Sequence, residues 1–184
     1  DKYDRQLRLW GAQGQKALGE TLVILVGASA AGTETLKNLV LPGIGSFCVV
    51  DDHATVEKQD VASNFFVPAA AAASGDSSRA QVASQYLEEL NEDVQGSFQH
   101  STKLSDITDW KATVFDKNNT SKKKLLVIAS DLEPKALESL SQACEEDKIP
   151  LIVVQSYGLI GVVRLQLSGQ IPLLDPKPTN APPD

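Results

Sequence analysis

The chain has 184 residues, enough for one α/β domain, and its 42% hydrophobic and 22% charged residues are typical of a globular protein. A net charge of −7 argues against nucleic acid or an anionic membrane surface as the main partner. No apolar run approaches the ~20 residues of a membrane span and no signal peptide opens the chain, so we expect a cytoplasmic and nuclear protein.

Strands and helices alternate along the sequence. A helix is predicted at about 3–18, and the apolar run 22–26, which lacks alternation, is typical of a strand buried on both faces. The alternating segment 162–167 favours an edge strand in antiparallel orientation. The remaining predicted elements are helices at 33–41, 79–90 and from 134 onward, and strands at 47–50, 94–99, 124–129 and 150–155. This order predicts a Rossmann-like, doubly wound, mainly parallel sheet over residues 1–168.

Two segments have biased composition. Residues 69–78 combine five alanines with small polar residues, and we expect them to form a mobile crossover. The segment 169–184 is rich in proline and is interpreted as a linker or the start of a missing segment.

A degenerate glycine turn follows the first strand. In the intact motif, G-x-G-x-x-G, glycines let the backbone approach a phosphate at a helix N-terminus. Gly27 and Gly32 are present, but Ser29 replaces the middle glycine, and a left-handed Ser29 would cost about 1–2 kcal/mol. Asp51, at the end of the next strand, could accept a ribose hydroxyl, so a dinucleotide-binding oxidoreductase is one alternative.

Few residues could serve a metal site or a nucleophile. The two histidines are too few for a histidine-rich metal site. Cys48 and Cys144 have no histidine or lysine beside them in sequence, so no catalytic cysteine is predicted.

Four further stretches carry a family resemblance. They are the opening Tyr3-Asp4-Arg5-Gln6, LKNLVLPGIGSF at 36–47, SNFF at 63–66 and YGLIG at 157–161. Together they resemble the ThiF/MoeB-like adenylation domains that activate ubiquitin-like modifiers. Within that group they are most similar to the regulatory, non-catalytic subunits of heterodimeric neddylation-activating enzymes. The resemblance spans residues 3–167 and implies the N-terminal, adenylation-type half of a longer subunit. The equivalent subunit of the SUMO-activating enzyme is the alternative within the same class.

The resemblance implies an inactive nucleotide site. Catalytic members hold ATP with glycines where this chain has Ser29 and Ala30, with an arginine where it has Val67, and with a lysine where it has the segment 75–78. We therefore expect no cofactor or metal on this chain, with ATP and Mg²⁺ on the partner subunit, and no enzymatic activity of the chain alone. The retained positions are expected to be vestigial: Gly27, Gly32, Asp51, Asn64 and, as a former Mg²⁺ ligand, Asp131. From the residues alone, Asn64 is a turn former and Asp131 lies in the N-cap region of the next helix.

The resemblance also implies a catalytic partner subunit, with the ubiquitin-like modifier bound through the complex. Arg5 matches an arginine that reaches the phosphates in the partner's ATP site; without the family it is a solvated helix residue. The candidate interface residues, for which burial in the chain's own core is an equal alternative, are Leu39, Val40, Leu41, Ile44, Phe65 and Phe66.

Overall fold

A six-stranded sheet organises the molecule. The computed structural model describes residues 2–101, 103–118 and 124–168. The strands follow the order β3-β2-β1-β4-β5-β6, in which the first five are parallel and β6 runs antiparallel to β5. Their bounds are Thr21–Val26 for β1, Ser46–Asp51 for β2, Gln95–His100 for β3, Lys124–Ser130 for β4, Leu151–Tyr157 for β5 and Ile160–Gln166 for β6. The predicted doubly wound sheet and its antiparallel edge strand are both confirmed.

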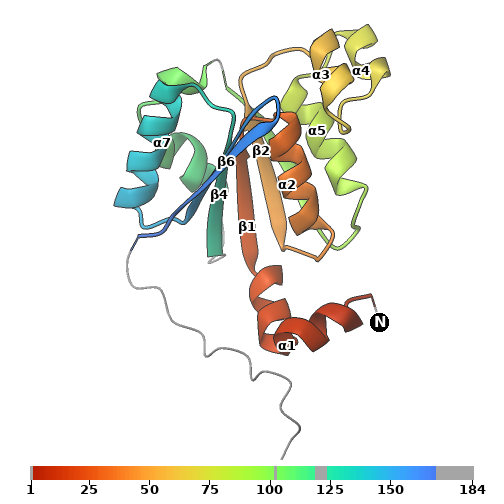
Figure 1. Ribbon diagram of the computed structural model, residues 1–184, viewed down its shortest axis with the longest axis vertical. Coiled ribbons are helices and arrows are strands. Elements are labelled where there is room, and N and C mark those ends of the chain that lie inside the picture. The colour runs from red at the N-terminus through yellow and green to blue at the C-terminus, as the bar shows by residue number, and fades with distance from the viewer. Residues whose placement is uncertain (1, 102, 119–123, 169–184) are drawn as a thin grey trace, which may run out of the picture.

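Helices cover both faces of this sheet (Figure 1). On one face α2 (Ala30–Val40) and α5 (Arg79–Glu88) pack over β1 and β2. The other face carries α7 (Pro134–Glu146) and three short helical segments, η1 (Leu104–Asp106), η2 (Lys111–Phe115) and α6 (Asp116–Asn118). Because both faces are covered, β1 is buried along almost its whole length, which explains its unbroken apolar sequence.

The N-terminal helix α1 (Asp4–Gly19) lies outside these layers, beyond the edge of the sheet where β1 begins (Figure 1). It bends at Gly11, and no residue of the helix is buried. Its start is tied down because the Tyr3 hydroxyl donates to Asp93 at 2.9 Å. The helix therefore presents most of its surface, including Leu9, to solvent.

The crossover between β2 and α5 contains two short helices that the sequence analysis did not predict. They are α3 (Lys58–Ser63) and α4 (Ala69–Ser74). Alanine is the best helix former, and Gly75 ends α4 in the left-handed conformation, with φ at 67°. A small apolar cluster of Val56, Val67 and Val82 anchors the crossover to α5. The low-complexity composition therefore encodes a short packed helix.

The β6 edge is exposed on both of its faces. Ile160 and Val162 point to one face and Val163 and Leu165 to the other, and each is between 47% and 74% exposed. Among the helices of the described ranges, none combines the length and apolar character that crossing a bilayer requires. The proline-rich segment 169–184, expected to be a linker, lies outside the described residues.

Candidate functional site

The two retained glycines allow close packing between the turn and β4. Gly27 has φ at +88°, and a Cβ there would lie 2.3 Å from the carbonyl oxygen of Ser130. A Cβ at Gly32 would lie 2.7 Å from the Ser130 Cβ. Both contacts are far below van der Waals distance, so the fold itself requires glycine at both positions.

Ser29 caps helix α2 and is not left-handed, so the penalty of a left-handed serine does not arise. Its φ of −70° and ψ of 167° are extended. Its hydroxyl accepts a hydrogen bond from the Gly32 amide at 3.2 Å and lies 2.7 Å from the Ser130 hydroxyl. The Ser29 hydroxyl thus accepts the hydrogen bond of an amide at the start of α2. In an intact motif, amides at this end of the helix donate to a phosphate.

Asp51 is fully buried at the end of β2, directly beside the glycine turn. Its carboxylate accepts hydrogen bonds from the Ala28 amide at 2.6 Å and from the His53 amide at 2.8 Å. Burial alone would raise the pKa of Asp51, but the hydrogen bond from His53 and the guanidinium of Arg79 hold that pKa well below its usual range. Asp51 is therefore a charged, internally paired residue.

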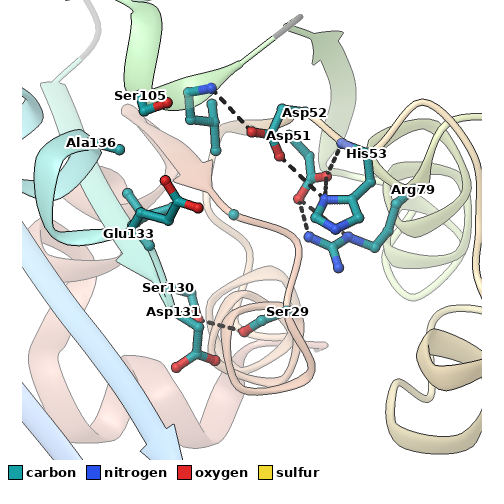
Figure 2. Close-up of a pocket in the computed structure, with 13 residues that line it drawn as sticks. Ser29, Asp51, Asp52, His53, Arg79, Ser105, Ser130, Asp131, Glu133 and Ala136 are labelled. Carbon is teal, nitrogen blue, oxygen red and sulfur yellow. Dashed lines mark hydrogen bonds and ion pairs between the residues drawn. The ribbon is translucent and has the colours of Figure 1, made fainter.

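Arg79 is the partner of Asp51 that the sequence analysis missed. It is the first residue of α5, next to the N-cap Ser78, and its Nη2 lies 2.7 Å from Asp51 (Figure 2). Its Nη1 lies 3.0 Å from Asp60. Segment 75–78 itself supplies no cation, and Arg79 follows it directly. The sequence offers no local signal for this pair, because the two residues lie 28 positions apart.

Asn64 and Val67 contribute to the fold of the crossover. The Asn64 side chain is buried; it donates to the Ala28 carbonyl at 3.1 Å and accepts from the Thr33 hydroxyl and the Phe66 amide, both at 3.0 Å. Val67 is buried in the small cluster under α4. Asn64 thus acts as the predicted turn former and also ties the crossover to the glycine turn.

Asp131 follows β4 with φ at +50° and is exposed. It accepts a hydrogen bond from the Ser156 amide at 2.8 Å, whereas the N-cap of α7 is Glu133. Asp131 therefore lies two residues before the N-cap of α7, and its side chain links the end of β4 to β5.

Gly27, Ser29, Asp51, Arg79 and Asp131 are among the residues that line a pocket of about 260 Å³ at the carboxyl ends of the strands (Figure 2). It is smaller than the roughly 300–1,000 Å³ of ordinary small-molecule sites. Its charged lining consists of Asp51, Asp52, Asp131, Glu133, Arg79 and His53. Four carboxylates outnumber the Arg79 guanidinium and the His53 ring, which is a poor environment for the negative charges of a triphosphate.

A metal would find little free capacity in this pocket. Donor atoms of Asp51, Asp52 and His53 lie within 4.8 Å of one another. However, Asp51 is already bound by N–H groups, and its hydrogen bond raises the pKa of His53, which favours the protonated ring that cannot ligate a metal. The three side chains therefore fit a hydrogen-bonded network.

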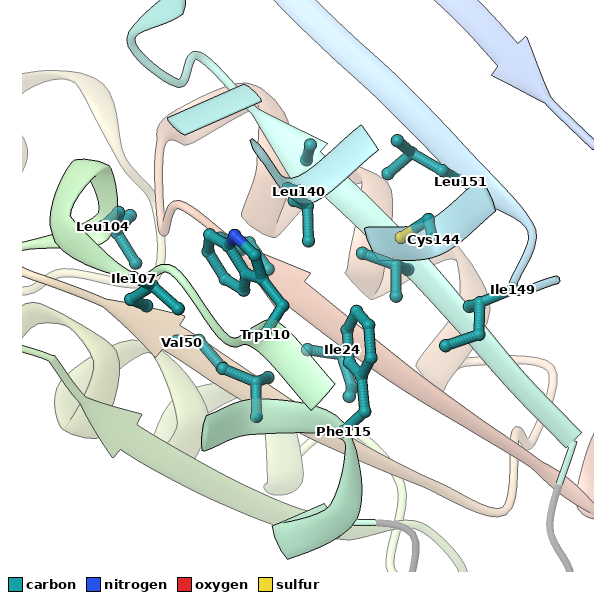
Figure 3. Packing of buried hydrophobic residues seen from close by; sticks show 14 of the residues in the cluster. Ile24, Val50, Leu104, Ile107, Trp110, Phe115, Leu140, Cys144, Ile149 and Leu151 are labelled. Carbon is teal, nitrogen blue, oxygen red and sulfur yellow. The ribbon is translucent and has the colours of Figure 1, made fainter. Parts of the chain in front are cut away.

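Neither cysteine resembles an activated nucleophile. Both are buried, and Cys144 lies in the core near Ile149 and Leu151 (Figure 3). Burial raises the pKa of the Cys144 thiol to about 12 and raises that of Cys48 as well. Thiols of this kind stay protonated at neutral pH.

Arg5 lies at the other end of the sheet from this pocket. It is exposed on α1, ahead of β1, whereas the glycine turn follows β1; six strand residues span about 20 Å. The neighbouring Arg8 is paired with Asp4 at 2.8 Å, and in the described ranges Arg5 has no ion-pair partner. Arg5 is thus available to a group outside this chain.

The interface candidates divide into core and surface residues. Ile44 and Phe66 are each 1% exposed, and Val40 is fully buried, so the alternative of core burial holds for them. Leu39 is partly buried against the same cluster. Leu41 and Phe65 remain on the surface, 48% and 81% exposed.

The fold is that of an adenylation-type domain, and the chain belongs to the ThiF family, whose profile matches residues 3–182. It is similar to the NEDD8-activating enzyme E1 regulatory subunit of Gallus gallus (40% identical over 180 residues, 98% of this chain) and of Danio rerio (44% over 164 residues, 89% of this chain). The chain spans 31% and 29% of the length of these two relatives.

A solved structure, that of E. coli MccB, shares the fold, with a TM-score of 0.70 at 17% identity over 92% of this chain and 46% of that one. Family membership favours the adenylation-type interpretation over a dinucleotide-binding oxidoreductase.

Proposed function

We propose that this chain is the pseudo-adenylation part of a regulatory subunit that pairs with a catalytic subunit to activate a ubiquitin-like modifier of the NEDD8 type. The observation that supports the proposal is an adenylation-type scaffold in which the Ser29 hydroxyl accepts the Gly32 amide at the start of α2 and Arg79 pairs with the buried Asp51. The 40% and 44% identity to subunits of that name supports the choice of modifier. ATP and Mg²⁺ would bind to the partner, and the complex would act in the cytoplasm and nucleus.

Reconstitution with purified catalytic subunits tests this proposal. We expect the chain to co-purify with a NEDD8-type catalytic subunit and to bind no ATP by calorimetry when alone. Preferential pairing with a SUMO-type catalytic subunit would instead identify the equivalent subunit of that pathway. Tight ATP binding by the chain alone would refute the proposal.

Arg5 is proposed to stabilise the phosphates in the partner's ATP site. An exposed guanidinium without an ion-pair partner in the described ranges is free to act in trans, as a permanent planar cation. Arginines supplied in this way contribute roughly 10³–10⁵ to rates in GTPases, and adenylyl transfer is expected to depend on them less. We expect Arg5→Ala to reduce modifier-dependent pyrophosphate exchange while heterodimer assembly is unchanged.

The matched control for Arg5 is Arg8→Ala, on the same helix, whose guanidinium is paired with Asp4. This variant should exchange pyrophosphate at the parental rate. Unchanged exchange in Arg5→Ala at both saturating and limiting ATP would remove Arg5 from the mechanism.

Phe65 is proposed to contact the catalytic subunit. Its ring is 81% exposed and makes an edge-to-face contact with the buried Phe66, with ring centroids 5.4 Å apart. Exposed aromatics are typical interface anchors, and truncating one costs about 2 kcal/mol or more, roughly a 30-fold loss of affinity. We expect Phe65→Ser to weaken co-purification by about that factor. Phe98→Ser, which removes another exposed ring on β3, is the control, and equal effects of the two would contradict the assignment.

A further inference from the structure

The carboxylate of Asp51 has no acceptor capacity left. A carboxylate offers about four lone-pair sites on its two oxygens. Oδ2 is approached by the Ala28 amide at 2.6 Å and by Nη2 and Nε of Arg79 at 2.7 and 3.3 Å. Oδ1 is approached by the amide and the ring nitrogen of His53, at 2.8 and 3.1 Å. A ribose hydroxyl arriving at this carboxylate would therefore have to displace one of the chain's own donors.

Arg79 is the donor that a ligand would compete with. The Ala28 and His53 amides are fixed by the backbone, whereas the guanidinium reaches Asp51 from α5, across the polar side of the pocket (Figure 2). The side chain is only 13% exposed, and its other end is held by Asp60, which also accepts the Glu57 amide at 2.9 Å. One cation thus joins β2 to the capping box of α3.

The rest of the pocket places apolar side chains next to the buried carboxylate. Its lining includes the apolar side chains of Leu104, Leu132 and Ala136 together with the polar Asp51 and Arg79. A wall that can pack against a base and an acid that can bind a ribose are the two parts that nucleoside recognition needs. Asp51 differs from a ribose-binding acid because the Arg79 guanidinium already takes its acceptor positions.

We propose that Arg79 is a built-in occupant of the nucleoside position: its guanidinium takes the hydrogen bonds of Asp51 that the cis-diol of a ribose would use. This inference rests on the proposed role as a pseudo-adenylation domain and gives that domain a specific reason for not binding a nucleoside. It also implies that the block is reversible by substitution, because the carboxylate and the apolar wall are still present.

Adenosine binding to the chain tests this inference. Adenosine is uncharged, so it probes the base and ribose positions without the phosphates that the pocket's carboxylates disfavour. We expect no adenosine-dependent rise in melting temperature for the parent chain. For Arg79→Ala we expect an affinity at least about tenfold higher, since the acceptors vacated by the guanidinium become available to the diol.

Two controls separate diol recognition from a non-specific cavity. 2′-Deoxyadenosine should lose most of the gain, and the double variant Asp51→Asn/Arg79→Ala should lose it as well. A folded Arg79→Ala chain that binds adenosine no better than the parent, or that binds both nucleosides equally, would overturn the inference. So would a parent chain that binds adenosine as well as the variant does.

Arg79→Lys keeps the inference testable if the alanine variant does not fold. The ammonium preserves a positive charge between Asp51 and Asp60 but cannot donate to both from a planar fork. A smaller gain in adenosine affinity is expected, and no gain would overturn the inference. Heterodimer formation with the catalytic subunit is measured separately. If the variant gains adenosine affinity but the chain does not form the heterodimer, only the proposed function is rejected. If the heterodimer forms but the variant gains no adenosine affinity, Arg79 is rejected as the occupant.

Discussion

A Gly27→Ala variant is expected to lose about 2–5 kcal/mol of unfolding free energy, as the sum of a left-handed backbone penalty and the clash of an overpacked contact. The backbone at Gly27 has φ at +88°, and the added methyl group would lie 2.3 Å from the Ser130 carbonyl oxygen. Neither atom can move easily, because β1 and β4 are hydrogen-bonded neighbours in the centre of the sheet. Urea denaturation measures the loss.

Gly75→Ala is the matched control for this prediction. Gly75 is also left-handed, with φ at +67°, but an added Cβ would meet no atom within 4 Å. It should cost only the backbone penalty of about 1–2 kcal/mol. Equal losses in the two variants would show that the contact with Ser130 is not what requires glycine in the turn.

An Asp51→Asn variant is expected to lose about 3 kcal/mol at neutral pH, at the low end of the cost of breaking a buried ion pair. Asp51 is fully buried, and the substitution leaves the Arg79 guanidinium with Asp60 as its remaining ion-pair partner. Asp131→Asn makes the same chemical change at an exposed carboxylate and should alter stability by less than about 1 kcal/mol. Similar losses in both variants would contradict a special role of the buried pair.

The Asp51 prediction has a definite pH dependence. The pKa of Asp51 is lower in the folded chain than its ordinary value of 3.8, so the unfolded chain binds the proton more readily. The contribution of Asp51 to stability is therefore fully present above about pH 5 and is lost as the pH falls below about 4. The stabilities of the parent and Asp51→Asn should converge under acidic conditions, as followed by denaturant titrations at several pH values. A constant difference between them would rule out the ion pair as the cause.

Local patterns in the sequence were sufficient for the sheet. The unbroken apolar run of β1 indicated burial on both faces, and the alternation at 162–167 indicated the edge strand β6. The same reasoning failed at 69–78 because composition alone does not show what a short alanine helix packs against, here Val67 and Val82. Pattern predicts an element best when the signal lies within the element.

The candidate site could be predicted only in part, for a related reason. Gly27, Gly32 and Asp51 mark it in the sequence, because turn chemistry and strand ends are local features. The ion pairs of Arg79 join residues 28 and 19 positions apart, so no local pattern reveals them. Ile44 and Phe66 were equally ambiguous, since an apolar side chain in a loop has the same sequence signature in a core as in an interface.

The exposed β6 edge has a consequence for the abundance of this chain in a cell. Within the described residues β6 is the last strand of the sheet and has apolar side chains on both faces, and such an edge is a template for aggregation unless it is covered. Copies that remain uncovered are natural clients for chaperones and substrates for proteolysis. We therefore expect the steady-state abundance of this chain to follow the supply of whatever covers β6, so that excess copies are removed.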